Sequence, residues 1–81
     1  MHKLARLDQK YVWHPFTQMR DWARRESIVL ERGKGAVLED VRGKKFLDAN
    51  ASIWTNLHGH NHPKLNTALQ RQLKKVAHTS A

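Results

Sequence analysis

The stretch SIVLERGKGAVLEDVRGKKFLDA, residues 27–49, decides the fold. Its β-branched and apolar residues fall into three short runs that are separated by glycines and by a turn sequence. Such runs are typical of strands, and we expect strands at about 28–31, 36–40 and 45–48. Gly33 and Gly35 are predicted to form the first turn. Asp40 opens the second turn and Gly43 closes it with a positive φ, so an antiparallel meander is expected.

Helical patterns lie on both sides of the meander. The spacing of Leu4, Leu7 and Tyr11 predicts a helix over about 3–13, which ends ahead of Pro15. A loop is expected over 14–27, with one helical turn within DWARRE. Another loop over 50–62 leads to a helix over about 63–78.

The second helix carries an apolar stripe of Leu65, Leu69, Leu73 and Val76. This stripe and the inward face of the meander are expected to cover one another. The predicted fold class is therefore α+β, with an N-terminal helix, a three-stranded antiparallel meander and a long amphipathic C-terminal helix.

Length and composition allow several kinds of protein. The 81 residues suit one small domain or a piece of a larger one, and the absence of cysteine excludes disulfides and thiolate metal ligands. The formal charge of +8 keeps a nucleic-acid-binding module open as an alternative. The basic residues are scattered as short pairs, which favours a solvated surface instead.

No apolar run is long enough to span a bilayer, and the N-terminus lacks the apolar core of a secretory signal. A mitochondrial transit peptide, suggested by Lys3, Arg6 and Lys10, is the weaker alternative to a cytoplasmic location. We expect a cytoplasmic protein without nucleic-acid or membrane partners.

The segment LHGHNHP, residues 57–63, places His58, His60 and His62 at alternate positions. In a strand these side chains would point the same way and could bind zinc. The favoured interpretation is a loop that enters a helix, with Gly59 turning the chain, Asn61 capping the helix and Pro63 in its first turn. No metal site is therefore expected.

Other catalytic patterns are weak. The GKG of residues 33–35 lacks the length and the Lys-Ser/Thr of a phosphate-binding loop. Asp48, Ser52 and His58 form a triad by residue type only, without a nucleophile elbow.

Three stretches together resemble a known family. They are WHPFTQM (13–19), GKGAVLEDVRGKKFLDANASIW (33–54) and LHGHNHPKLNTALQRQLKKVAH (57–78). Their order and spacing resemble the N-terminal region of class III aminotransferases, which use pyridoxal 5'-phosphate. The first stretch resembles the branch of biotin biosynthesis, in which S-adenosylmethionine donates an amino group to 8-amino-7-oxononanoate and 7,8-diaminononanoate forms. Another class III ω-aminotransferase is the alternative within the family.

The resemblance implies that substrate-binding residues lie at Phe16, Ile53 and Trp54. Phe16 stands where the family has an aromatic, often a tyrosine, that stacks on substrates. Ile53 replaces the first tryptophan of a pair that some members carry, and Trp54 keeps the second. A core position under the sheet is the alternative for Trp54.

The resemblance also implies what this chain lacks. The lysine that holds the cofactor, the phosphate loop, the aspartate at the pyridine nitrogen and the carboxylate-binding arginine lie downstream in the family. No catalytic, cofactor-binding or metal-binding residue is expected within 1–81. We expect an N-terminal segment of a fold-type I enzyme, part of its small domain, that forms a homodimer and is inactive in isolation.

Overall fold

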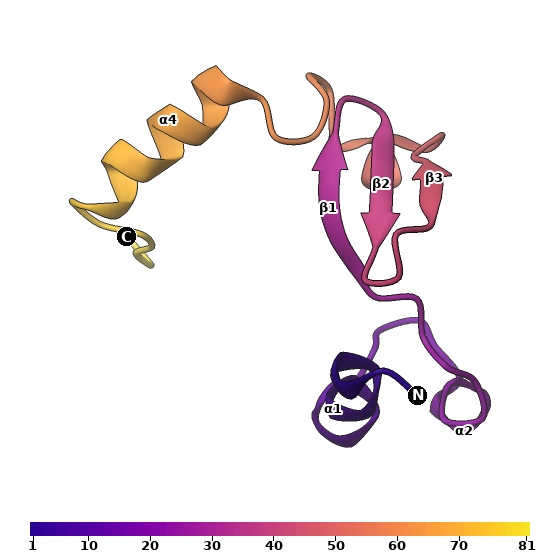
Figure 1. Ribbon diagram of the computed structural model, residues 1–81. Helices are drawn as coiled ribbons and strands as arrows, with labels where there is room; N and C mark the ends of the chain where they lie inside the picture. The colour runs from indigo at the N-terminus through magenta and orange to yellow at the C-terminus, as the bar shows by residue number, and fades with distance from the viewer.

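The computed structural model describes all residues from Met1 to Ala81, and it contains four short helices and one sheet (Figure 1). In chain order the elements are α1 (Lys3–Tyr11), α2 (Met19–Trp22), β1 (Leu30–Lys34), β2 (Val37–Asp40), β3 (Lys45–Leu47), α3 (Ala51–Trp54) and α4 (Pro63–Leu73). The expected α+β class and the antiparallel meander are confirmed, with the strand order β1-β2-β3.

The two turns of the meander differ in how they are built. Between β1 and β2, Lys34 pairs with Val37 and Gly35 adopts the left-handed conformation, with a φ of 59°. Between β2 and β3, one carboxylate oxygen of Asp40 accepts bonds from the main-chain N–H groups of Arg42 and Lys44, and Gly43 has a φ of 83°. The second turn was predicted correctly by its Asp and Gly.

The prediction that Gly33 belongs to the first turn is wrong. Gly33 lies inside β1 and pairs with Leu38. A Cβ atom added to Gly33 would lie 2.9 Å from the Cβ atom of His60, so this glycine is needed for a close approach rather than for a turn. The strand β1 begins at Leu30 and ends at Lys34, two to three residues later than expected.

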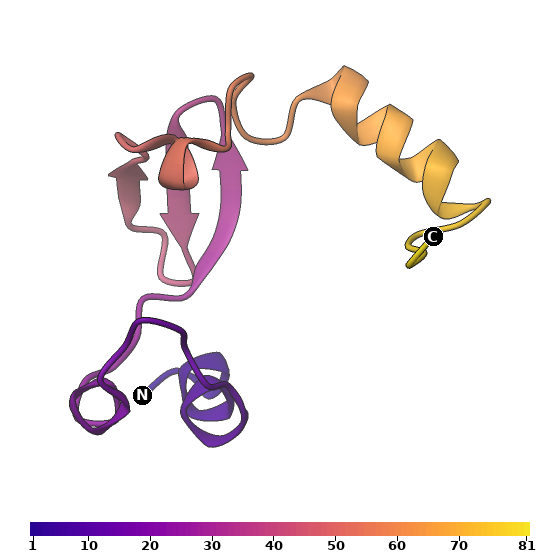
Figure 2. The same ribbon diagram turned by 180° about the vertical axis from the view of Figure 1, so that it is seen from behind.

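The expected packing of the C-terminal helix on the meander is also wrong. In Figures 1 and 2, α4 runs away from the sheet. The side chains of Leu65, Leu69 and Leu73 are all exposed. The helix ends at Leu73 rather than near residue 78, since no other element packs on it to stabilise a further turn.

The chain as a whole is open. Ala5 is its single buried residue, and the radius of gyration of 15.6 Å exceeds the roughly 12 Å of a compact chain of this length. The helices α1 and α2 lie together beyond one end of the sheet (Figure 1). No helix has the length and apolar character that crossing a membrane would require. The large exposed apolar surface means that these elements do not form a core by themselves.

Candidate functional site

The most unusual backbone of the chain lies in α3. Ala51, Ser52, Ile53 and Trp54 have φ values of 49°, 50°, 59° and 63°, which makes this a left-handed helical turn without a glycine. Each such residue costs roughly 1–2 kcal/mol relative to the right-handed form. Figure 2 shows the turn crossing in front of the sheet in the rear view. Runs of this kind persist only where the surroundings hold them, and they gather at functional sites.

Asp48 holds the start of this turn. Its Oδ1 accepts a bond of 3.0 Å from the Ser52 main-chain N–H, and its Oδ2 accepts one of 2.8 Å from the Ser52 hydroxyl. The Nε2 atom of His60 lies 2.7 Å from the same Oδ2. The Asp48 side chain is 7% exposed, whereas that of His60 is 20% exposed. We refer to Asp48, Ser52 and His60 as the Asp48 cluster.

The Asp48 cluster favours an ionised carboxylate. The Ser52 main-chain N–H, then the Ser52 hydroxyl and then His60 lower the pKa of Asp48 below its ordinary value, although burial acts in the opposite direction. The cluster is not a hydrolytic triad, because Asp48 lies between Ser52 and His60 and the hydroxyl donates to the carboxylate rather than to the imidazole. The cluster instead holds Ser52 and His60 in fixed positions relative to Asp48.

The LHGHNHP loop attaches the cluster to the sheet. The main chain of His60 forms a two-bond antiparallel bridge with Gly35, with N···O distances of 2.8 and 3.2 Å. Gly59 has a φ of 84°, and a Cβ atom there would lie 3.0 Å from the Cα atom of Gly35. The two chain segments can therefore approach this closely only because residue 59 is a glycine. A Cβ atom added to Gly35 would meet no atom within 4 Å, so glycine at that position serves the positive φ of 59° instead.

The three histidines do not converge. His60 contacts Asp48, while the ring centroids of His58 and His62 lie 6.3 Å apart with an edge-on orientation. No group of three or more histidine, cysteine or acidic side chains in residues 1–81 is arranged to hold a metal ion.

The expected role of Asn61 as helix cap is wrong, since the N-cap of α4 is His62, whose Nδ1 accepts from the Lys64 N–H at 3.3 Å. Asn61 instead adopts a positive φ of 57° and accepts a bond from the Asn66 side chain. Pro63 lies in the first turn of α4 and Gly59 turns the chain, as expected.

A second carboxylate cluster lies near the N-terminus. The Oδ1 and Oδ2 atoms of Asp8 lie 2.8 and 3.0 Å from the Nε2 atom of His14, and Oδ2 also accepts from the Trp22 indole N–H at 2.9 Å. The rings of His14 and Trp22 are 4.3 Å apart. This Asp8 cluster joins α1 to α2 across the loop that carries Phe16.

The expected substrate-binding side chains all face outward. Phe16 is fully exposed and has a φ of 52°, and Ile53 and Trp54 are 67% and 88% exposed. The alternative of Trp54 as a core aromatic under the sheet is wrong within this chain. Ile53 and Trp54 share one turn, whereas the loop between α1 and α2 that carries Phe16 lies beyond the end of the sheet (Figure 1).

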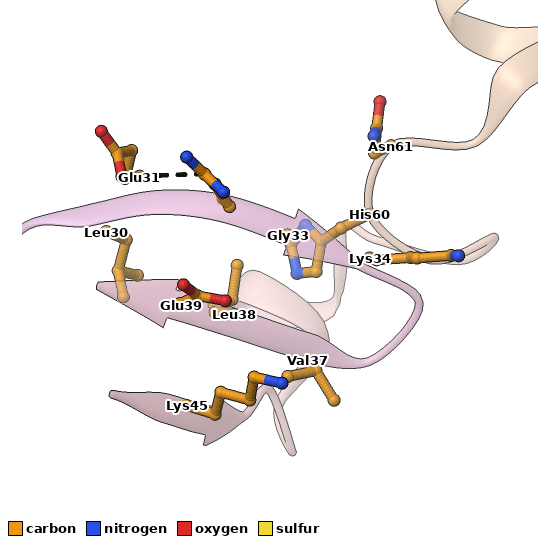
Figure 3. A pocket seen from close by; sticks show the side chains of 11 residues that line it. Leu30, Glu31, Gly33, Lys34, Val37, Leu38, Glu39, Lys45, His60 and Asn61 are labelled. Atoms are coloured by element: carbon orange, nitrogen blue, oxygen red, sulfur yellow. Dashed lines mark ion pairs between the residues drawn. The ribbon is translucent and has the colours of Figure 1, made fainter. Parts of the chain in front are cut away.

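An open groove of about 1040 Å³ runs along β1 and β2 (Figure 3). Its lining is mixed: acidic Glu31 and Glu39 and basic Lys34 and Lys45 surround a few apolar side chains, and the His60 ring lies at one end. Charges of both signs on an open surface do not favour one ligand charge.

Sequence reasoning missed both clusters. It assigned no role to His14 and tested Asp48 with Ser52 and His58, whereas the structure pairs Asp48 with His60. The four-residue spacing of Asp48 and Ser52 was an available signal, because an aspartate can bond the main chain of a following residue. Nothing in the spacing of Asp8, His14 and Trp22 indicated contact.

The chain belongs to the class-III aminotransferase family. The model of that family, "Aminotransferase class-III", matches residues 19–81, which include the meander, α3 and α4. This family depends on pyridoxal phosphate.

Two of its similar relatives share one name. The chain is 53% identical over 77 residues, or 95% of its length, to the adenosylmethionine-8-amino-7-oxononanoate aminotransferase of Aquifex aeolicus, and 49% identical to that of Staphylococcus aureus. It spans only about a sixth of these relatives, 17% of each.

Solved structures agree on the fold. The Methanocaldococcus jannaschii enzyme of the same name matches with a TM-score of 0.83 at 40% identity, covering 95% of this chain and 18% of that chain. A transaminase from the marine bacterium Virgibacillus matches with a TM-score of 0.87 at 33% identity, covering 99% of this chain and 18% of that chain.

The residues present do not build a pyridoxal phosphate site by themselves. Such a site needs an enclosed lysine, an anion-binding cradle and an acid beside the ring nitrogen. Every lysine of this chain is exposed, and the imidazoles of His2 and His62 already accept from main-chain N–H groups at the starts of α1 and α4.

Proposed function

We propose that this chain is the N-terminal segment of an aminotransferase of biotin biosynthesis. The enzyme transfers the amino group of S-adenosylmethionine to 8-amino-7-oxononanoate and yields 7,8-diaminononanoate. The observation that carries the proposal is the identity of 40–53% to five relatives that share this name, each over 90–96% of the chain.

Within this enzyme we assign the chain to the substrate side of the active site. Pyridoxal phosphate, bound mainly by residues beyond residue 81, supplies the electron sink. The exposure of Phe16, Ile53 and Trp54 supports their assignment as substrate contacts. Aromatic faces suit the adenine ring and the sulfonium cation of S-adenosylmethionine, and Ile53 adds apolar surface for the alkyl chain of the acceptor. Together they would orient substrates and exclude water.

The exposed apolar surface supports a larger assembly. The stripe of α4 and the outward aromatics have no partner among these 81 residues. We assign them to contacts with the rest of the enzyme. The homodimer and the cytoplasmic location stay predictions.

The test uses the full-length enzyme that contains this chain. The enzyme is loaded with pyridoxal phosphate and given S-adenosylmethionine and 8-amino-7-oxononanoate, and 7,8-diaminononanoate is measured by mass spectrometry. Formation of the product with this donor, and not with L-alanine, is the expected result. Absence of product from an enzyme that transfers other amines would overturn the substrate assignment.

A second candidate is a class III ω-aminotransferase with another donor. It is favoured by the likeness to an omega-transaminase from Thermomicrobium roseum, with a TM-score of 0.83 at 33% identity. Its signature is turnover of ω-amines with pyruvate or 2-oxoglutarate and none with S-adenosylmethionine.

A further inference from the structure

The backbone of α3 needs an external support, because four consecutive non-glycine residues are left-handed. Inside the turn, the main-chain N–H of Trp54 donates to the Asn50 carbonyl and that of Thr55 to the Ala51 carbonyl. The Thr55 hydroxyl also donates to the Ser52 carbonyl at 2.8 Å. These bonds close the turn, but they do not fix where it lies on the sheet.

The connection to the sheet is made at Asp48. Asp48 directly follows β3, and its main-chain N–H donates to the Ala36 carbonyl at 2.8 Å. Its carboxylate then binds Ser52, the second residue of the turn, through both main chain and side chain. The turn is therefore held by a residue that is itself fixed in the sheet.

His60 approaches the same carboxylate from another segment. Its main chain is bridged to Gly35 at the β1–β2 turn, and its ring reaches Asp48 Oδ2. When the Asn56 amide is oriented with its oxygen towards His60, its nitrogen lies 3.0 Å from the Gly59 carbonyl oxygen and can donate to it. One carboxylate thus joins three segments: the end of β3, the left-handed turn and the LHGHNHP loop.

We propose that Asp48, Ser52 and His60 are positioning residues that hold the left-handed turn in place and thereby set where Ile53 and Trp54 meet the substrate. This rests on the proposed function for the identity of the substrates, but not for the geometry. None of the three would touch the reacting atoms. Their effect is transmitted by the backbone of residues 51–54, whose side chains at 53 and 54 point outward.

The left-handed backbone provides a matched pair of variants. Ser52→Ala and Ser52→Gly both remove the hydroxyl that donates to Asp48. Glycine adopts a φ of 50° without the penalty that alanine meets. If the cluster serves to hold this conformation, the glycine variant should need it less than the alanine variant does.

The experiment uses the full-length enzyme with Asp48→Asn, Ser52→Ala, Ser52→Gly and the double variant Asp48→Asn/Ser52→Gly. The first readout is hydrogen exchange of a peptide that covers residues 50–56, measured without substrate. The second is the KM and kcat for each substrate. We expect Asp48→Asn and Ser52→Ala to speed up exchange and to raise the KM of the substrate that contacts the turn roughly tenfold, with kcat changed by less than about threefold.

Ser52→Gly should stay near wild type, and in the double variant it should reverse most of the increase in KM that Asp48→Asn causes. If Asp48→Asn does not fold, the Ser52 pair carries the same test. Unchanged exchange, an equal effect of alanine and glycine at Ser52, or a loss of kcat alone would each overturn the proposal.

A failed proposed function is distinguishable from a failed positioning role. If the enzyme does not use S-adenosylmethionine, the exchange measurement still tests the cluster. The kinetic measurement is then made with the amine that the enzyme does transfer.

Discussion

The Asp8 cluster and the Asp48 cluster use the same parts in different settings. In each, one carboxylate lies within 2.8 Å of a histidine Nε2 atom and accepts from a further donor. Each cluster also contains a residue two positions before a positive-φ residue with a large exposed side chain: His14 before Phe16, and Ser52 before Trp54. The chain thus presents two outward aromatics, each close in the sequence to a member of one of these clusters.

The clusters differ in what they are attached to. Asp8 binds only side chains, its own side chain is 22% exposed, and it joins two short helices beyond the end of the sheet. Asp48 accepts from a main-chain N–H, is 7% exposed, and is linked to the sheet through its own N–H and through the Gly35–His60 bridge. We therefore expect the Asp48 cluster to be more rigid than the Asp8 cluster. Its removal should also affect residues further away in the structure.

The largest expected effect comes from the glycine that lets the two segments of the Asp48 cluster meet. Gly59→Ala introduces a Cβ atom 3.0 Å from the Gly35 Cα atom at a φ of 84°, so main chain must move. We expect a loss of roughly 2–4 kcal/mol in the free energy of unfolding of the full-length enzyme. Chemical denaturation with the enzyme in fixed buffer measures it.

Gly43→Ala is the matched control. Gly43 has a nearly equal φ of 83°, but the nearest atom to an added Cβ is the Glu39 carboxylate oxygen at 4.0 Å. It should cost only the left-handed conformation, about 1 kcal/mol. Equal losses for the two variants would show that the contact between Gly59 and Gly35 is not needed.

The next prediction compares the effects of removing the charge of each carboxylate. Asp48→Asn and Asp8→Asn keep the side-chain volume but remove the charge that accepts from histidine. We expect Asp48→Asn to speed up hydrogen exchange in both 50–56 and 57–63, because it joins these segments. Asp8→Asn should act only on residues 12–22. An equal spread of the two effects along the chain would contradict the difference in attachment.

The sheet could be predicted from the sequence because the patterns that specify its strands and its second turn are local. Asp40 and Gly43 form a turn whose residue types specify its conformation, and alternating apolar runs specify strands. The position of Gly33 could not be predicted in this way. Its reason is the approach of His60, which is 27 residues later in the chain, and no local pattern reports such a contact.

The packing of α4 shows a different limit of prediction from sequence. Its apolar stripe is a correct pattern on a real helix, but the sequence does not say which surface covers it. The left-handed turn was equally hidden, since Ala51, Ser52, Ile53 and Trp54 have no preference for a positive φ. Only the resemblance of the sequence to its family indicated that Ile53 and Trp54 matter, and that role stays a proposal.

A smaller effect should appear at acidic pH. The pKa values of Asp8 and Asp48 are both lowered in the folded chain, by His14 and by the Ser52 main-chain N–H respectively as the largest causes. A lowered folded pKa stabilises the fold above the unfolded value of about 3.9, and this stabilisation is lost as pH falls through the folded value. Wild type should therefore unfold at a higher temperature than Asp48→Asn at about pH 6, and the difference should shrink as the pH falls below about 3.9 and through the lowered pKa of Asp48. A difference that stays constant with pH would show that the charge of Asp48 is not what stabilises the turn.

The smallest effect is expected where the N-terminal helices are tied to the sheet. Glu26 accepts from the His2 main-chain N–H at 2.8 Å and pairs with Arg42 of the β2–β3 turn, but the Arg42 side chain is 60% exposed. Exposed pairs are weak and are screened by salt within about 8 Å at physiological ionic strength. Arg42→Ala should therefore lower the unfolding midpoint slightly in dilute buffer and not at all in about 1 M salt. Arg24→Ala, which removes a longer and more exposed pair with Asp21, is the control that should change neither. If Arg42→Ala were as disruptive as Asp48→Asn, the N-terminal helices would be fixed to the sheet as firmly as the left-handed turn is, and the contrast between the two clusters would be lost.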